Sequence, residues 1–376
     1  MKRLITLLTV LLLMIGLIGC TLNKDNTSDE NQNNEKTNQN SNNNKTDTKN
    51  DSDGVKEPKQ TKETLPDISE YYPITKNTRY SYEGIGNEYS TFTVYPDYIS
   101  ETKVQQRVEN GGTVMANVLE IKDGKLTKVY SRGEAYYREN LLKLTGENQE
   151  IMLMEPLKKG TTWTLKDGSI RTITNMTVDL TTPSGNYKAI EVTTDKGNDK
   201  TLDYYAKDVG LVKSVFVTGE TEISSTLSKV EENVPLVQNI TFYYPNINDD
   251  KIYYQSRPVS FYTNEITRKV LTAAYKGQSP NQLGTVFSKN TEINSLYLNQ
   301  DGNVYLDLNK AFIEEMSAGA AFEGLILQSI VNTVGQYYQC EKVFLTIDNQ
   351  PYESGHISMN KGESFKVQSA GTIEIK

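Results

Sequence analysis

The side chains that most often act as nucleophiles, bases or soft metal ligands are scarce in this chain. It has two cysteines, Cys20 and Cys340, and one histidine, His356. A Ser-His-Asp or Cys-His arrangement would therefore have to use His356, and a zinc site of several histidines is excluded. We expect Cys340 to be a small buried apolar residue and His356 to be an exposed structural residue in a loop or strand start. These residues predict no catalytic residue, no cofactor and no metal site.

Acidic residues are the other candidates for chemistry. The pairs Glu231-Glu232 and Glu314-Glu315 could suggest a glycosidase, but adjacent residues on a strand or helix point apart. We interpret both pairs as solvated charges. Residues 248–250, with the sequence Asn-Asp-Asp, lack the spaced oxygen ligands of a calcium loop and predict a turn.

Cys20 is the residue for which the sequence predicts a covalent modification. Lys2 and Arg3 precede an uncharged apolar run, residues 4–18. The run is short for a permanent helix across a hydrocarbon core of roughly 30 Å, and its layout is that of a secretory signal. It ends in Leu17-Ile18-Gly19-Cys20, which resembles the lipoprotein cleavage box of bacteria. That resemblance implies removal of residues 1–19 and attachment of a diacylglyceryl group, with palmitate among the expected acyl chains, to the Cys20 thiol.

An uncleaved N-terminal anchor helix is the alternative, and it would place the rest of the chain at the same membrane. Either way we expect the protein on the extracytoplasmic face of the cell membrane, in a Gram-positive envelope or a spore membrane. The net charge of −8 and the absence of a Lys/Arg-rich stripe argue against nucleic acid as a partner. Once Cys20 carries lipid, one free cysteine remains, so an intramolecular disulfide is excluded.

The chain divides by composition into a polar linker and two folded domains. Residues 20–66 are rich in Asn, Lys, Asp and Thr, and they carry too little apolar surface to offset the entropy of ordering. They predict a disordered tether between the membrane and the folded part. Residues 67–233 predict a β-rich domain, and residues 234–376 predict a compact α+β domain.

The β-rich domain is predicted from short runs of Thr, Val and Tyr with polar alternation and turn residues between them. The runs are residues 89–95, 113–121, 126–130, 171–174, 177–180, 187–193, 201–206 and 211–217. Asp123-Gly124 predicts a tight turn between two of them, and Asp208-Val209-Gly210 predicts the turn of a late hairpin.

The C-terminal domain combines period-two strands with two helical patterns. A first helix is predicted over residues 265–276, with Asn264 as N-cap and Gly277 as its stop, and a second over residues 320–338. Residues 304–308 and 343–347 each alternate aliphatic and polar side chains. The predicted assembly lays both helices on the aliphatic face of one small sheet.

Within this domain the sequence resembles the GerMN domain of the GerM family. The resemblance covers about residues 237–357. Its carriers are Tyr262-Thr263-Asn264, residues 271–280 (LTAAYKGQSP), residues 301–309 (DGNVYLDLN), Phe312, Glu323, Gln328, residues 330–333 (IVNT), Gln336 and residues 343–348 (VFLTID). The resemblance implies a non-enzymatic, envelope-anchored module of sporulation or spore germination whose fold is similar to that of ring-building domains. GerM proteins often carry two such domains, and this chain shows one.

The expected function is that of an interaction or assembly lipoprotein. Its expected partners are membrane lipid through acylated Cys20 and envelope or sporulation proteins, with peptidoglycan and a second copy of the chain as further candidates. The alternative is a ligand-binding lipoprotein that recognises wall glycan or a small solute. It draws on the 24 tyrosines against 9 phenylalanines, because exposed rings can stack on sugars or partner surfaces. Adjacent tyrosines, as in Tyr204-Tyr205 and Tyr243-Tyr244, are expected to send one ring to the core and one to solvent.

Overall fold

A twelve-stranded antiparallel sheet dominates the first part of the folded chain. The computed structural model describes residues 65–277, 279–280 and 283–375; the predicted signal peptide, Cys20 and nearly all of the predicted tether lie outside this range. The strands follow the order β6-β5-β4-β3-β2-β1-β12-β11-β10-β9-β8-β7. They are β1 (Arg79–Ile85), β2 (Phe92–Ile99), β3 (Lys103–Glu109), β4 (Val114–Lys122), β5 (Lys125–Arg132), β6 (Glu150–Met154), β7 (Thr162–Thr164), β8 (Ile170–Thr182), β9 (Gly185–Lys196), β10 (Asp199–Ala206), β11 (Gly210–Thr218) and β12 (Thr221–Glu231).

Tight turns connect most neighbouring strands, as their residue types require. Asp123 and Gly124 have φ angles of 50° and 65°, which is the left-handed backbone that a two-residue hairpin between β4 and β5 needs. The predicted hairpin of β10 and β11 is also present, with Asp208 at φ 63° and Gly210 at φ 99°. Residues 171–174 and 177–180 were expected as separate strands, but both belong to β8, whose register with β9 shifts between them.

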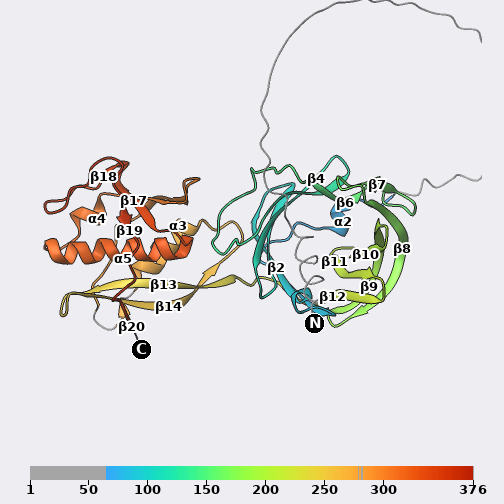
Figure 1. Ribbon diagram of the computed structural model, residues 1–376, viewed down its shortest axis with the longest axis horizontal. Helices are drawn as coiled ribbons and strands as arrows, with labels where there is room; N and C mark the ends of the chain where they lie inside the picture. The colour runs from blue at the N-terminus through green and yellow to red at the C-terminus, as the bar shows by residue number, and fades with distance from the viewer. Residues whose placement is uncertain (1–64, 278, 281–282, 376) are drawn as a thin grey trace, which may run out of the picture. The chain divides into compact units, whose positions relative to one another are not determined.

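The sheet curls until its two end strands, β6 and β7, come together (Figure 1). The indole Nε1 of Trp163 on β7 donates to the carbonyl of Ile151 on β6 at 3.0 Å, and Arg171 Nη1 on β8 donates to the same carbonyl at 2.8 Å. The short helix α2 (Ile68–Tyr71) lies inside the curve, with Ile68 buried in the same core cluster as Leu126 and Leu153. The chain segment before β1 therefore fills part of the space that the sheet encloses.

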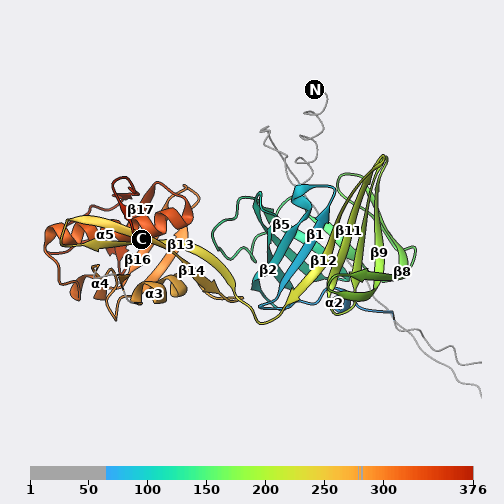
Figure 2. The ribbon, with the colours of Figure 1, turned by 90° about the horizontal axis from the view of Figure 1, so that it is seen from below.

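Among the described residues, the second part of the chain combines two smaller sheets and three helices, whose arrangement is visible in Figure 2. One sheet has the order β13-β14-β20 and the other β15-β16-β17-β18, with β19 also paired to β17. The strands are β13 (Leu236–Asn246), β14 (Lys251–Phe261), β15 (Ile293–Leu298), β16 (Val304–Leu308), β17 (Lys342–Ile347), β18 (Gln350–Pro351), β19 (Phe365–Lys366) and β20 (Ile373–Glu374). The helices are α3 (Thr267–Lys276), α4 (Ala311–Glu314) and α5 (Ala320–Tyr338), and a short 3-10 turn, η2 (Glu88–Ser90), precedes β2 in the first part.

The predicted fold class is confirmed, since a β-rich part precedes an α+β part with few helices. The second predicted helix has the bounds of α5, and Gly277 is the C-cap of α3 as expected. The predicted N-cap is wrong. Asn264 has a left-handed φ of 69° and its side chain accepts a hydrogen bond from the Ile99 backbone N–H at 2.8 Å, so the N-cap of α3 is Ile266, which has no side-chain cap.

Helix α5 is more buried than its apolar stripe predicts. Ser329, Asn332 and Thr333 are fully buried, although they lie off the stripe of Ile326, Ile330 and Val334. The cause is the position of α5 between the β13–β14 hairpin and strand β17 (Figure 1). The polar side chains find partners there: Thr333 Oγ1 accepts from the Tyr243 backbone N–H at 3.0 Å.

The segment that leads into the large sheet is hydrogen-bonded to the segment that follows the β13–β14 hairpin. The Asn77 backbone N–H donates to Thr263 Oγ1, and the Thr263 backbone N–H donates to Asn77 Oδ1, both at 2.8 Å. The Val234 backbone N–H also donates to the Asn77 carbonyl at 3.0 Å. These bonds join residues that lie before β1, after β12 and after β14.

Candidate functional site

Three aromatic side chains form a row across the outer face of the sheet β15-β16-β17. Tyr297 and Tyr305 are cross-strand partners with ring centroids 5.6 Å apart and an interplanar angle of 10°. Tyr305 and Phe344 are partners on the next pair of strands, at 4.7 Å and 20°. Tyr297 at the end of the row is 48% exposed. We call these three residues the aromatic ladder.

The alternation of the strands places the ladder on the side away from the core. Val304 and Leu306, which flank Tyr305, are buried, as are Val343 and Leu345, which flank Phe344. Since successive strand residues point to opposite faces, the rings project outward. Tyr305 is fixed further because its hydroxyl donates to Asp301 Oδ2 at 2.9 Å, and this hydrogen bond to Asp301 raises the pKa of the phenol.

A buried carboxylate supports the ladder from the same strand. Asp307, two residues after Tyr305, is 3% exposed. Its Oδ1 accepts from Thr346 Oγ1 at 2.6 Å and from the Asn349 backbone N–H at 2.7 Å, and its Oδ2 accepts from Asn294 Nδ2 at 2.9 Å. These bonds link all three strands and so fix the relative positions of the residues in the aromatic ladder.

Strand β15 is an edge of this sheet. Among the strands of the described residues it pairs with β16 alone. At its start, Arg268 Nη1 donates to the Ile293 carbonyl at 2.9 Å, and helix α3 covers this end. Apart from this cover at its start, β15 has no protection of its own, because its sequence carries no charged residue, proline or glycine. Edge strands are usually protected by charge, proline or cover, so an unprotected edge beside an exposed ring is a surface suited to binding a partner.

Histidine 356, the residue on which a catalytic triad would depend, is instead part of a carboxylate cluster. Its Nδ1 lies 2.9 Å from Glu323 Oε2, while Tyr352 and Ser354 donate to Glu323 Oε1 at 2.8 and 2.5 Å. Burial alone would raise the pKa of Glu323, but the hydrogen bonds from Ser354, His356 and Tyr352 outweigh it and hold the pKa below its usual value. Because Ser354 donates to the carboxylate and not to the imidazole, the cluster is not arranged to activate a nucleophile.

Cys340 is half-buried, which is less than the full burial expected of it, and its Sγ lies 3.2 Å from the Lys342 carbonyl. Burial raises the pKa of the Cys340 thiol, which disfavours the reactive thiolate. Cys340 bonds a backbone carbonyl, whereas His356 bonds Glu323. These contacts therefore do not form a Cys-His pair.

The predicted acidic pairs and the Asn-Asp-Asp segment make local contacts. Glu231 Oε1 bonds Lys229 and Glu315 Oε1 accepts from Asn290, while Asp249 accepts from Tyr253 in the turn between β13 and β14. Throughout the part of the chain that the structure describes, no cluster of three or more His, Cys, Asp or Glu side chains could hold a metal ion. Nor is any helix there both long and apolar enough to cross a membrane.

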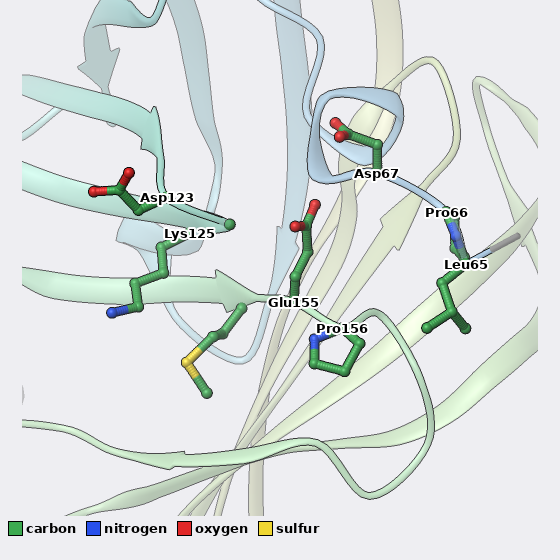
Figure 3. A pocket seen from close by; sticks show the side chains of 9 residues that line it. Leu65, Pro66, Asp67, Asp123, Lys125, Glu155 and Pro156 are labelled. Atoms are coloured by element: carbon green, nitrogen blue, oxygen red, sulfur yellow. The ribbon is translucent and has the colours of Figure 1, made fainter. Parts of the chain in front are cut away.

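A depression of about 580 Å³ lies where the described chain begins, between the β4–β5 turn and the end of β6 (Figure 3). Its carboxylates already have structural roles. Glu155 Oε1 accepts from the Ile68 backbone N–H at 3.0 Å, and Asp67 caps α2 through the Ser69 backbone N–H at 2.7 Å. Both carboxylates therefore hold α2 in place. This makes the depression a poor candidate for a ligand site.

A second polar cluster lies on the large sheet. Glu150 on β6 bonds Lys128 at 2.7 Å and Arg171 at 2.9 Å, and Asp203 on β10 accepts from Ser214 at 2.6 Å. Burial raises the pKa of Asp203, while the bond from Ser214 and the charge of Arg171 lower it, with a net upward shift. Asp203 is half-buried and shares a strand face with the core residue Tyr205.

The tyrosine pattern was only partly predicted. Tyr205 is buried and Tyr204 is half-buried, as expected, but Tyr243 and Tyr244 are both buried, because the Tyr243 hydroxyl bonds Gln336 of α5 and the Tyr244 ring packs against Tyr275 of α3. The ladder escaped prediction, since its rings are single aromatics on three strands. The alternation of Tyr305 and Phe344 with aliphatic neighbours indicated outward rings, but only the strand register aligns them.

A comparison with protein families finds a match within the second part of the chain. The family model Germane, described as sporulation and spore germination, matches residues 241–353. No curated protein matches the chain. A structure of the tandem GerMN domains of the sporulation protein GerM from Bacillus subtilis is 24% identical with a TM-score of 0.27, covering 36% of this chain and 47% of that one.

Two further structures are similar to parts of the chain. The first GerMN domain of the same Bacillus subtilis protein is 17% identical with a TM-score of 0.25, covering 33% of this chain and 94% of that one. A structure described as a candidate lipoprotein from Parabacteroides distasonis is 14% identical with a TM-score of 0.28, covering 43% and 98%. The family-model match carries the conclusion: the C-terminal part of the chain is GerMN-like, as its sequence predicts.

Proposed function

We propose that this protein is an extracytoplasmic lipoprotein, anchored by acylated Cys20, whose GerMN-like domain binds envelope proteins and performs no catalysis. The match of residues 241–353 to a sporulation and germination family is the observation that carries the proposal. It favours a role in sporulation, spore germination or another function of the cell envelope. The aromatic ladder and the uncharged edge of β15 lie within the matched residues and supply a surface for the partner.

The contacts of the candidate catalytic residues agree with a binding role. Glu323 holds His356 and Ser354 on one carboxylate, so neither is poised as a base or nucleophile. Cys340 has a raised thiol pKa caused by burial. Replacing His356 and Cys340 together should leave the cellular role intact in a strain that carries the variant; loss of that role with normal protein levels would contradict a non-catalytic function.

The anchor is tested by substituting the residue that would carry the lipid. Two acyl chains hold a protein stably at a membrane, whereas one gives marginal binding. The wild-type chain should sediment with membranes, and its mature N-terminal peptide should begin at Cys20 with the mass of a diacylglyceryl group. Cys20→Ser should be released from the membrane. A wild-type peptide with an unmodified Cys20 would refute the anchor.

The partner surface is tested by capture from envelope extracts. The full-length wild-type chain should retain a protein that Tyr297→Lys loses, because the charge is introduced at the exposed end of the ladder. Tyr89→Lys is the matched control, since Tyr89 is similarly exposed at 45% but lies in η2 of the other part. Equal capture by the wild type and both variants would exclude the ladder as the surface.

A ligand-binding lipoprotein is the second candidate, and the charged cluster on the large sheet favours it. Asp203 is half-buried and lies near the charged pair of Arg171 and Glu150, so this cluster offers charges of both signs to a polar solute. Thermal unfolding of the wild type and Asp203→Asn in the presence of muropeptides and small cations tests this reading. A ligand that raises the melting temperature of the wild type alone would support it, and the absence of any shift would remove it.

A further inference from the structure

The outer edge of β15 has a composition that does not repel another strand. Its sequence, Ile-Asn-Ser-Leu-Tyr-Leu, has no charge, and the register irregularity with β16 is confined to its first residues, between Ile293 and Ser295. From Ser295 to Leu298 the pairing is regular. Addition of an extended segment to such an edge is a common mode of recognition, in which backbone groups give affinity and alternate side chains give specificity.

We propose that the occupant of this edge is a second copy of the chain, paired antiparallel through β15 about a twofold axis at Tyr297. The inference rests on the proposed function and names its partner. In this register Leu296 of one copy lies opposite Leu298 of the other, so aliphatic side chains meet on the core face. Ser295 lies opposite Asn299, so uncharged polar side chains meet on the outer face. The same patch serves both copies, as an interface with twofold symmetry requires.

The aromatic ladder supports this register. Its rings stack face to face, at interplanar angles of 10° and 20°. Both faces of the central Tyr305 ring are therefore covered by its neighbours, as is the inner face of the Tyr297 ring. The outer face of the Tyr297 ring is free at the sheet edge. Pairing at Tyr297 stacks it on Tyr297 of the second copy and extends the row across the axis, from Phe344 of one copy to Phe344 of the other. Cross-strand aromatic pairs of this kind stabilise antiparallel pairing.

Charges at the two ends of the paired segment are complementary in the same register. Asp301 is exposed in the turn after β15, and Arg268 bonds the start of the strand, so antiparallel pairing brings Asp301 of one copy to the end of the interface where Arg268 of the other lies. The carbonyl of Ile293 is held by the guanidinium of Arg268 at 2.9 Å. The pairing therefore brings a carboxylate of each copy toward an arginine of the other, twice by symmetry. Hydrogen-bonding groups near Asp301 keep the pKa of this carboxyl below its usual value, so it is charged at neutral pH.

The membrane supplies the concentration that a short interface needs. Four to five residues of strand make a small contact, which would be weak between freely diffusing copies. Anchoring of both copies to one bilayer raises their effective concentration, as linking two binding modules does.

Disulfide trapping in membranes tests the pairing and its register. The full-length acylated chain carries Cys340→Ser, so that Tyr297→Cys introduces the one free thiol. A residue on the twofold axis meets itself, and oxidation of these membranes should give a disulfide-linked dimer. Ser295→Cys, on the same strand but opposite Asn299, should give far less, and combining Ser295→Cys with Asn299→Cys should restore the dimer. Tyr89→Cys is the exposed control away from the edge.

The outcomes separate the pairing from the proposed function. A Tyr297→Cys dimer no more abundant than that of Tyr89→Cys overturns the pairing, and equal trapping by Tyr297→Cys and Ser295→Cys overturns the register. If trapping fails while the wild type still captures an envelope protein that Tyr297→Lys loses, the edge binds a different partner and the proposed function stands. Circular dichroism of each cysteine variant verifies that a missing dimer does not reflect misfolding.

Discussion

Arg138 and Asp97 form an ion pair in which both side chains are fully buried, with Arg138 Nε 3.2 Å from Asp97 Oδ1. The other carboxylate oxygen is 3.0 Å from Nη2 of Arg107. Arg138 also donates to the carbonyl of Tyr262 at 3.3 Å and to that of Glu265 at 3.1 Å. Since Asp97 belongs to β2 while Tyr262 and Glu265 lie between β14 and α3, the pair connects the β-rich part to the GerMN-like part through satisfied, buried charges.

Removing Arg138 should therefore strongly destabilise the fold. Arg138→Ala leaves Asp97 buried with one of its two guanidinium partners missing, and breaking a buried pair in this way costs about 3–5 kcal/mol. Urea unfolding followed by circular dichroism measures the change. Lys188→Ala is the control, because its partner Asp179 and Lys188 itself are 79% and 72% exposed and such pairs contribute little. A similar midpoint for both variants would show that the buried pair is not a stabilising connection.

The Glu323 cluster should make stability depend on pH below neutrality. The folded pKa of Glu323 is depressed, so its contribution is present above the unfolded pKa of about 4.3 and is lost as the pH falls through the folded value. Glu323→Gln should lower the free energy of unfolding at pH 7 by about 1–3 kcal/mol, and the difference from the wild type should shrink toward pH 3. Glu314→Gln, at the exposed end of α4, should show no such trend. A difference that stays constant from pH 7 to pH 3 would contradict the cluster's role.

The stacking in the aromatic ladder should be measurable as stability. Phe344→Leu keeps an apolar side chain but removes the ring that stacks on Tyr305 at 4.7 Å, and aromatic pairs contribute about 0.5–1.5 kcal/mol beyond burial. The variant should lose about that much in thermal or urea unfolding. Phe365→Leu on β19, a half-buried ring on the same sheet, is the matched comparison. Equal losses would indicate that area alone, and not stacking, accounts for the effect.

Cys340 should react slowly in the folded protein. The burial that raises its thiol pKa also shields Sγ, and the thiolate is the reactive form. In a chain with Cys20→Ser, an aromatic disulfide reagent at pH 8 should modify Cys340 several-fold more slowly before than after unfolding in urea. Equal rates in the two states would mean that the thiol is open in the native protein.

The sequence predicts local structure well where a single element decides it. The bounds of α5 follow from its apolar period, and the turn at Asp123-Gly124 follows from residues that tolerate a left-handed backbone. Asn264 shows where such reasoning fails: its type is suited to an N-cap, but its side chain bonds the backbone of Ile99, far away in the sequence. When a residue type suits two structural roles, as Asn264 does, contacts between distant segments decide which role it takes.

The candidate surface could be predicted only in part for the same reason. The aliphatic alternation around Tyr305 and Phe344 indicates outward rings, but their alignment with Tyr297 depends on an antiparallel and a parallel register that no local pattern specifies. Likewise, Glu323 falls within the family resemblance, yet its bonds to Tyr352, Ser354 and His356 join helix α5 to a loop after β18. Neither the charge pattern nor the spacing of these residues indicates that pairing.

The reciprocal bonds between Asn77 and Thr263 bear on how the molecule would respond to mechanical tension. Strand β1 begins opposite the end of β12, with Arg79 paired to Glu231, so the chain enters and leaves the large sheet at one place. A pull from the N-terminal side against a partner gripping the C-terminal part would be transmitted from residue 77 to residues 234 and 263 through their hydrogen bonds. Before residue 77, the same pull would load the contacts of α2 inside the large sheet, where the Ile68 N–H donates to Glu155 and the Asp208 N–H donates to the Glu70 carbonyl, so these bonds and the junction at Asn77 would share the force.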